Sequence, residues 1–313
     1  MIQKIANPGL TNLDRDVFVK DAGRRSFTIG HNLSYHELFS LEKLSELSKS
    51  LPEDLVQCFP GNVPVTYNPN THENRSSASH LIEQMHKCNS RVVLKGVQNI
   101  PAYAKLLDDC LCQIEEYSDL VSQGMALEQC DIYISSPGAV TPFHFDTVNS
   151  FLLQVGGQKK VFSFNQDDRS VVGEQRIEEY LNGEHRDFLY DDTNRFRAEE
   201  FTLQENEGLH LPAFAPHIVE NGSEVSISFS ITFETTASAD RERLHRLNSK
   251  LRQFGWSPSE VADSSWRDKT KLTALEMIAS VKRIVRSLGT KIASKWEQKK
   301  RSTALSVKRS ISD

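Results

Sequence analysis

The sequence predicts a mainly β protein with helical regions before and after the β region. From about residue 128, short β runs alternate with turns. Residues 225–232 alternate strictly between apolar and hydroxyl side chains, which is typical of a half-buried strand. Several short strands with turns between them favour an all-β barrel or a double-sheet jelly roll. We therefore expect three parts: a helical N-terminal region packing on the barrel (1–125), a barrel (126–236) and a helical, basic C-terminal extension (237–313).

The individual elements follow from local patterns. Residues 1–25 are polar and predict a loose arm. Apolar residues at helical spacing predict helices over 41–51, 79–88 and 102–117, and an apolar run predicts a strand over 91–95. The β region is expected to contain strands over 131–135, 150–155, 159–164, 208–212, 218–219 and 225–232, with a charged helix over 177–190. After the barrel we expect a helix over 240–254 and a long amphipathic helix over 270–296.

Composition limits the classes of function. Of the 313 residues, 38% are hydrophobic and 25% are charged, as in ordinary globular proteins with a core. The net charge of −5 gives no overall attraction to nucleic acid, but residues 267–313 hold 13 Lys and Arg against 4 Asp and Glu. The five cysteines are scattered and predict no disulfide framework. No signal peptide and no membrane-spanning apolar run is evident, so we expect a cytoplasmic protein without a membrane span.

Segment 141–146 carries the strongest candidates for chemistry. His144 and Asp146 stand two residues apart, so on an extended strand both side chains project to one face. His217, on a later β segment, would add a second imidazole. Two histidines and one carboxylate on one side of a metal suit non-haem Fe(II). Because a His-x-Asp pair alone is common, the prediction depends on the residues around it.

Lys159 is the candidate for binding a second ligand. A turn at Gly156-Gly157 predicts two antiparallel strands that return Lys159 over the site. A lysine inside a barrel is costly unless paired. A small dicarboxylate that chelates the metal could offer its far carboxylate to this ammonium, and Thr141 could donate its hydroxyl to the same group. The alternative interpretation is that Lys159 is a solvated residue on a strand. Lys160 has the opposite strand parity and should face outward.

These motifs resemble the JmjC or cupin-like family of Fe(II)/2-oxoglutarate oxygenases, in particular its small bacterial cupin-like members. The resemblance is carried by Thr-Pro-x-His-x-Asp over 141–146, Phe-Leu-Leu-Gln over 151–154, Gly-x-Lys over 157–159, and Pro-His-x-Val over 216–219 before a Ser-rich strand. Less specific matches extend into the flanking helical regions. The resemblance implies a double-stranded β-helix core, that is, a jelly roll of the cupin type.

The resemblance also implies site residues. It places iron at His144, Asp146 and His217, and 2-oxoglutarate at Thr141 and Lys159, with Thr232, Tyr133 and Ser150 as further candidates for binding the co-substrate.

The assignments of Ser150 and His217 each have an alternative in a nearby residue. Relatives often have Asn where this chain has Ser150, and Asn149 stands one residue before it. An offset of one residue moves a strand side chain to the other face, which puts the affinity for 2-oxoglutarate in question. His210 lies seven residues before His217, but the spacing from Pro212 to His217 agrees with that of the family's second histidine ligand, so the resemblance favours His217.

The implied function is an oxidoreductase, a dioxygenase of hydroxylase or demethylase type. It would convert 2-oxoglutarate to succinate and CO2 while oxidising a C–H bond of a small-molecule or protein substrate. One alternative is a non-catalytic cupin-like regulator that binds nucleic acid or a partner through the basic C-terminal helix. Another is a sugar isomerase or lyase, which usually has more histidine ligands and no need of Lys159. A homodimer through the C-terminal helices is a further hypothesis.

Overall fold

The computed structural model describes residues 8–66, 77–121, 125–183, 190–283 and 286. Contacts divide the chain into two compact units, residues 1–257 and 258–313. The helix that follows the last strand belongs to the first unit. The expected division at residues 125 and 236 stays a prediction.

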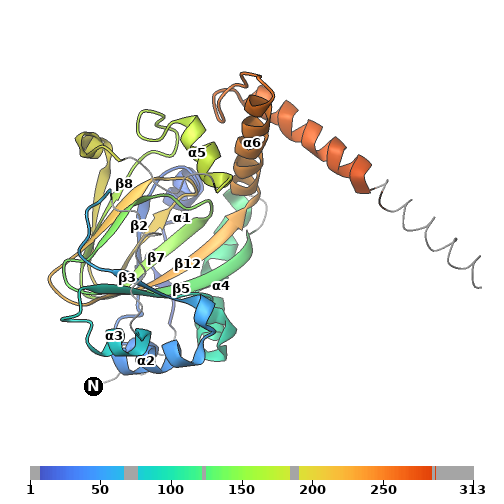
Figure 1. Ribbon diagram of the computed structural model, residues 1–313. Coiled ribbons are helices and arrows are strands. Elements are labelled where there is room, and N and C mark those ends of the chain that lie inside the picture. Colours follow the sequence, from blue (N-terminus) through green and yellow to red (C-terminus); the bar gives the residue numbers. More distant parts are fainter. Residues whose placement is uncertain (1–7, 67–76, 122–124, 184–189, 284–285, 287–313) are drawn as a thin grey trace, which may run out of the picture. The chain divides into compact units, whose positions relative to one another are not determined.

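Two antiparallel sheets form the centre of the first unit (Figure 1). The larger has the strand order β1-β2-β10-β7-β12-β5-β4-β3, and the smaller has the order β6-β11-β8-β9. The strands are β1 (Leu10–Thr11), β2 (Phe27–His31), β3 (Val56–Pro60), β4 (Ser90–Leu94), β5 (Met125–Ser135), β6 (Val140–His144), β7 (Asn149–Gly156), β8 (Lys159–Ser163), β9 (Glu199–Leu203), β10 (Glu207–Leu211), β11 (His217–Asn221) and β12 (Ser226–Thr235).

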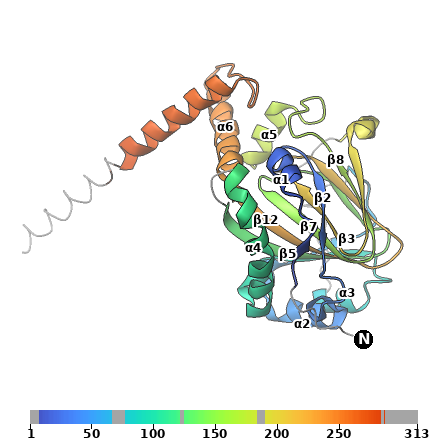
Figure 2. The same cartoon turned by 180° about the vertical axis from the view of Figure 1, so that it is seen from behind.

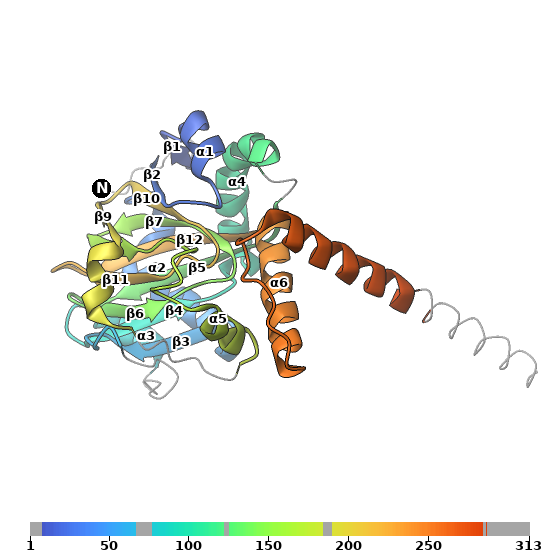
Figure 3. The same ribbon diagram turned by 90° about the horizontal axis from the view of Figure 1, so that it is seen from above.

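From β5 to β12 the chain crosses between the two sheets at each connection except that from β8 to β9, which pair in the smaller sheet. β5, β7, β10 and β12 lie together in the larger sheet, while β6, β8, β9 and β11 make up the smaller one (Figure 3). This arrangement is a double-stranded β-helix, so the predicted jelly roll of the cupin type is confirmed. β1 to β4, which precede the jelly roll in sequence, extend the larger sheet at both edges.

The inner faces of the two sheets meet in an apolar cluster drawn from both. It contains Leu152, Val161, Leu203, Leu209, Leu211 and Val219, with Tyr133 and Phe201 packed against it. Because alternate strand residues share a face, this cluster identifies the inward-facing side chains of each strand. In β12 the inward set is Ser226, Ser228, Ser230 and Thr232, which gives the larger sheet a hydroxyl-rich inner face.

The helices of the N-terminal region cover the outer face of the larger sheet (Figure 2). They are α1 (Arg15–Asp21), η1 (Glu37–Phe39), α2 (Leu41–Ser50), η2 (Glu53–Leu55), α3 (Ala78–Glu83), η4 (Val97–Asn99) and α4 (Pro101–Val121). Their apolar side chains join those of β5, β7 and β12 in the largest core cluster. Within the described residues, the prediction of a loose arm before residue 25 is wrong. α1 buries Phe18 there, but its two turns are too short to give a clear periodic signal.

The turn after β7 has the expected chemistry but a different role. Gly157 has a φ of +69°, and a Cβ there would lie 2.5 Å from the carbonyl oxygen of Val225. Glycine is therefore required by both conformation and space. β7 and β8 do not pair as a hairpin, because they lie in different sheets. Turn residues fix the local bend, whereas the sheet that the next strand joins is decided by tertiary packing.

Three further segments flank the smaller sheet or follow it: α5 (Glu174–Leu181), η5 (Asp192–Arg197) and α6 (Thr236–Gln253). The Thr235 and Ser238 side chains form a capping box at the start of α6. The charged helix predicted over 177–190 is shorter and begins earlier. Residues 184–189 lie outside the described part of the chain.

The second unit contains a helix over residues 265–283 with exposed Met277, Ile278 and Val281. The predicted helix over 270–296 is thus seen as far as residue 283. The rest of it, apart from residue 286, lies outside the described residues with most of the basic tail. Among the described residues, no helix combines the length and the apolar character required to cross a membrane. The C-terminal homodimer and the nucleic-acid alternative stay predictions.

Candidate metal centre

The structure brings His144, Asp146 and His217 together. Each offers a ligand atom, and these atoms all lie within 4.8 Å of one another. The two histidines are paired across β6 and β11, and their ring centroids are 4.1 Å apart. Asp146 follows the end of β6, and its backbone oxygen accepts a hydrogen bond from the Phe214 N–H at 2.6 Å. Among the described residues this is the one group of three or more His, Cys, Asp or Glu side chains arranged to hold a metal ion.

Hydrogen bonds to the backbone orient both imidazoles. Nδ1 of His144 lies 2.7 Å from the Pro142 carbonyl oxygen, and Nδ1 of His217 lies 3.0 Å from that of Ala215. If each Nδ1–H donates to its carbonyl, each Nε2 keeps a lone pair for a metal, which is the usual arrangement of metal-binding histidines. Burial, followed by the neighbouring His144, lowers the pKa of His217 to about 4, so this ring is neutral at physiological pH. Neutral imidazoles are the form that binds metal.

A β-bulge in β6 places Thr141 on the same face as His144. His217 pairs with His144 and Val219 pairs with Thr141, so two steps along β11 match three steps along β6. The extra residue reverses the alternation between the two positions. Val219 belongs to the inner apolar cluster, and directly paired residues share a face, so Thr141 also faces inward. A regular strand would have turned Thr141 away from the site.

Lys159 lies inside the barrel. It pairs with Asn221 of β11 and Leu203 of β9, and it is only 3% exposed. Burial lowers the pKa of Lys159 to about 7. No hydrogen bond or ion pair from its Nζ is present within the described part of the chain. Lys160 faces outward as expected, and its Nζ lies 2.6 Å from a carboxylate oxygen of Glu200.

The remaining candidates also face inward, from the larger sheet. Tyr133 packs against the inner apolar cluster, and burial, then Asp131 and Asp146, raise the pKa of its hydroxyl. Ser150 and Thr232 are directly paired between β7 and β12. The Thr232 hydroxyl donates to the Gln129 carbonyl oxygen at 3.3 Å.

Asn149 faces the other way from Ser150. Its Oδ1 accepts a hydrogen bond from the Ala213 N–H at 3.2 Å, and its Nδ2 lies 3.4 Å from the Thr235 hydroxyl. The amide therefore holds the loop before His217 and does not replace the Asn that relatives place one position later. Ser150 is the residue of the two that faces the barrel interior.

His210 lies on the outer face of the larger sheet. Its ring packs among Phe27, Phe151 and Phe233, and its Nε2 accepts a hydrogen bond from the Gly23 N–H at 3.2 Å. Burial lowers the pKa of His210 to about 3. Its position on the strand, one step out of phase with Leu209 and Leu211, keeps it away from His144.

The sequence analysis did not identify Arg91, which supports the hydroxyl of Thr141. Arg91 is buried on β4, and its Nη1 donates to the Thr141 hydroxyl oxygen at 3.1 Å. Its Nε donates to the Pro60 carbonyl oxygen at 3.2 Å. With a lone pair of Thr141 occupied by this donor, the hydroxyl hydrogen remains available to donate to a ligand. An arginine at the start of an otherwise apolar strand was the available signal.

Comparisons with known proteins agree with this fold. The sequence matches no protein-family model, and no curated protein matches it in sequence. An X-ray structure of E. coli ycfD is similar with a TM-score of 0.50 at 17% identity, covering 87% of this chain and 69% of that one. A crystal structure of the Escherichia coli ribosomal oxygenase YcfD, and one in complex with cobalt and 2-oxoglutarate, each give 0.52 at 14% identity, covering 87% and 68%. At these identities the similarity supports the fold.

Proposed function

We propose that this chain is an Fe(II)- and 2-oxoglutarate-dependent oxygenase. The observation that carries the proposal is the triad of His144, Asp146 and His217, with ligand atoms within 4.8 Å of one another and both Nδ1 atoms at backbone carbonyl oxygens. Two imidazoles and a carboxylate suit Fe(II) and leave coordination positions open for other ligands. His144 and His217 lie on β6 and β11, two paired strands, and Asp146 follows β6 directly, so little rearrangement is needed to bind the metal.

The co-substrate would bind to the charged and hydroxyl groups of the inner faces. Lys159 has a buried ammonium, and burying such a group without a partner is costly. A carboxylate of 2-oxoglutarate would form a charge-assisted hydrogen bond with it. Thr141, which accepts from Arg91, would donate to the same carboxylate. Tyr133, Ser150 and Thr232 offer further hydroxyls on the facing sheet.

When bound, the iron and 2-oxoglutarate supply the oxidising chemistry: 2-oxoglutarate and O2 yield succinate and CO2, and a C–H bond is oxidised. The protein's own residues hold the ligands in place and exclude water. The apolar cluster around Leu152, Val161 and Val219 lines the inner faces near Lys159 and strengthens its electrostatic interactions.

The neighbouring structures support the proposal by analogy. One of them is YcfD in complex with cobalt and 2-oxoglutarate, with a TM-score of 0.52 to this chain. YcfD is described as a ribosomal oxygenase, which is consistent with a protein substrate for this chain, although a small molecule also fits. A cytoplasmic location accords with this function.

The proposal is tested by ligand binding and by turnover. Anaerobic protein is titrated with Co(II) or Fe(II), and the loaded protein is titrated with 2-oxoglutarate by calorimetry. The iron form is then assayed with O2 for succinate. We expect stoichiometric metal binding that His217→Ala abolishes, followed by 2-oxoglutarate binding that depends on Lys159. Metal binding without any affinity for 2-oxoglutarate would instead favour a non-catalytic cupin-like protein.

A further inference from the structure

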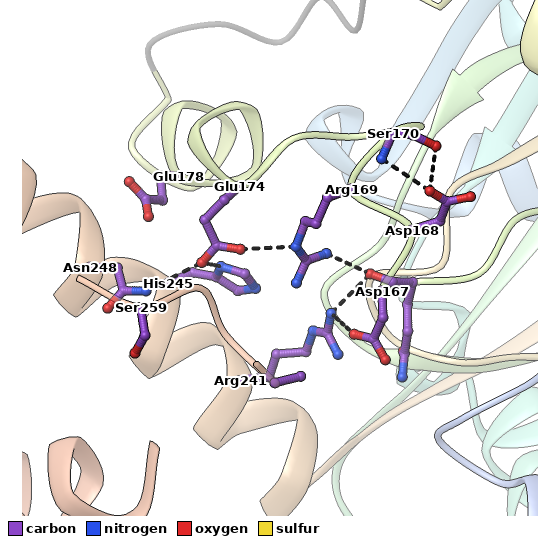
Figure 4. Close-up of polar contacts among 12 residues, drawn as sticks. Asp167, Asp168, Arg169, Ser170, Glu174, Glu178, Arg241, His245, Asn248 and Ser259 are labelled. Atoms are coloured by element: carbon purple, nitrogen blue, oxygen red, sulfur yellow. Dashed lines mark hydrogen bonds and ion pairs between the residues drawn. The ribbon is translucent and has the colours of Figure 1, made fainter. Parts of the chain in front are cut away.

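A group of charged and polar side chains, buried at its centre and exposed at Asp167, joins α5, α6 and the loop before α5 (Figure 4). We call it the α5–α6 cluster; it consists of Asp167, Arg169, Glu174, Arg241, His245 and Asn248. His245 and Asn248 are fully buried and Glu174 is 4% exposed. So many polar groups in a protein interior require close mutual pairing.

Glu174 is the centre of the α5–α6 cluster. One of its carboxylate oxygens lies 3.1 Å from Nδ1 of His245 and 3.3 Å from Nδ2 of Asn248. The other lies 3.2 Å from Nε of Arg169. Nearby, Nη2 of Arg241 lies 2.8 Å from Asp167 Oδ1. These contacts tie α6 to α5 and to the loop before it.

The side chains of Arg241 and His245 also pack on one aromatic ring, that of Phe214. The guanidinium carbon of Arg241 lies 5.4 Å from the ring centroid, within the range of a cation–π interaction. The imidazole of His245 lies 5.3 Å from it. Phe214 is 1% exposed and has a φ of +64°, a backbone conformation that bulky residues rarely adopt. Such a conformation persists only when the surrounding structure holds it.

Phe214 adjoins both segments that carry the proposed metal ligands, the one with Asp146 and the one with His217. Its N–H donates to the backbone oxygen of Asp146, and its ring stacks on Phe145, between the two ligands of that segment, with centroids 5.7 Å apart. The next residue, Ala215, provides the carbonyl oxygen that orients His217. A shift of Phe214 would therefore move two ligands relative to each other.

We propose that the α5–α6 cluster sets the geometry of the metal triad through Phe214, which makes Arg241 and His245 positioning residues for the metal. This inference rests on the proposed function, since it requires that the triad bind a metal. α6 follows the last barrel strand, so a helix outside the jelly roll takes part in shaping the site within it.

The test compares substitutions on one helix. Arg241→Met removes the cation from the Phe214 ring and the ion pair to Asp167. Arg252→Met is the matched control, because Arg252 also joins α6 to α5, through Glu178 at 3.1 Å, but does not contact Phe214. Each purified full-length variant is titrated with Co(II), and its visible absorption spectrum is recorded together with its thermal unfolding.

We expect Arg241→Met to weaken Co(II) binding by about tenfold or more and to change the Co(II) spectrum, as loss of groups that support ligands commonly does. Arg241→Lys, which keeps the cation, should restore part of both. Arg252→Met should lower the melting temperature but leave affinity and spectrum unchanged. If Arg241→Met does not fold, His245→Gln replaces it, because the amide can still donate to Glu174 while the ring is lost.

Wild-type affinity and spectrum in Arg241→Met or His245→Gln would overturn the inference while leaving the proposed function intact. Equal losses in Arg252→Met would also overturn it, since they would indicate a general loss of stability. Failure of the wild-type protein to bind Co(II) would refute the proposed function, and this inference with it.

Discussion

Replacing Lys159 with methionine is expected to stabilise the ligand-free protein and to weaken its binding of 2-oxoglutarate. Methionine has a similar length and no charge. The pKa of Lys159 falls from 10.5 to about 7 on burial. At 1.36 kcal/mol for each pKa unit, burying the ammonium costs up to roughly 4–5 kcal/mol at neutral pH. The free energy of unfolding should therefore rise by up to this amount, as when other buried charges are replaced by apolar residues.

The same substitution of Lys159 is expected to make 2-oxoglutarate binding less favourable, although it stabilises the ligand-free protein. Removing one partner of a buried charge pair costs about 2–5 kcal/mol. With about 3 kcal/mol lost, and 1.4 kcal/mol for each factor of ten, the Kd for 2-oxoglutarate should rise by roughly 100-fold. Urea denaturation measures the first effect, and calorimetry on the Co(II)-loaded protein measures the second.

Lys160→Met is the matched control. Its ammonium pairs with Glu200 on the outer face, and its side chain is 49% exposed. This substitution should change neither stability nor the Kd beyond a small amount. Equal loss of 2-oxoglutarate affinity in the two variants, or a Lys159→Met protein that binds as tightly as the wild type, would refute the assignment of Lys159.

The remaining predictions concern pH, the metal, the support of Thr141 and a helix cap. Because the folded-state pKa of Lys159 is lowered, the unfolded chain binds more protons between about pH 7 and 10.5, so the free energy of unfolding should rise with pH there and the rise should shrink in Lys159→Met. A bound carboxylate favours the ammonium form, so the affinity for 2-oxoglutarate should fall above about pH 7, with proton uptake visible as calorimetric heats that depend on the buffer. His217→Ala should remove measurable Co(II) binding, whereas the protein should still unfold cooperatively. Arg91→Gln and Thr141→Val should each weaken 2-oxoglutarate binding by about tenfold, and the double variant by little more, because one removes the Thr141 hydroxyl and the other removes the group that orients it; additive losses would contradict that link. Ser40→Ala should lower the free energy of unfolding by about 1 kcal/mol without affecting any ligand, because the Ser40 hydroxyl caps α2 through the Lys43 N–H.

The sequence alone determined most of the elements and the identity of the proposed ligands. Alternation over residues 225–232 predicted β12, because a strand with one buried face repeats every two residues. Residues 41–51 predicted α2 to within one residue, because its apolar spacing and its terminal proline are both local signals. The candidate metal ligands could be selected because their side-chain chemistry and motif spacing are also properties of the chain itself.

Relations between distant segments were decided only by the tertiary structure. The bulge that turns Thr141 inward depends on the pairing of β6 with β11, and local patterns do not encode a register shift between strands more than 70 residues apart. Arg91 and Thr141 meet because β4 pairs with β5 in the larger sheet. Likewise, the ring of Phe214 contacts α6 only once the loop, the barrel and the helix have packed together. These contacts arise from burial in a shared interior, whose neighbours no single stretch of sequence specifies.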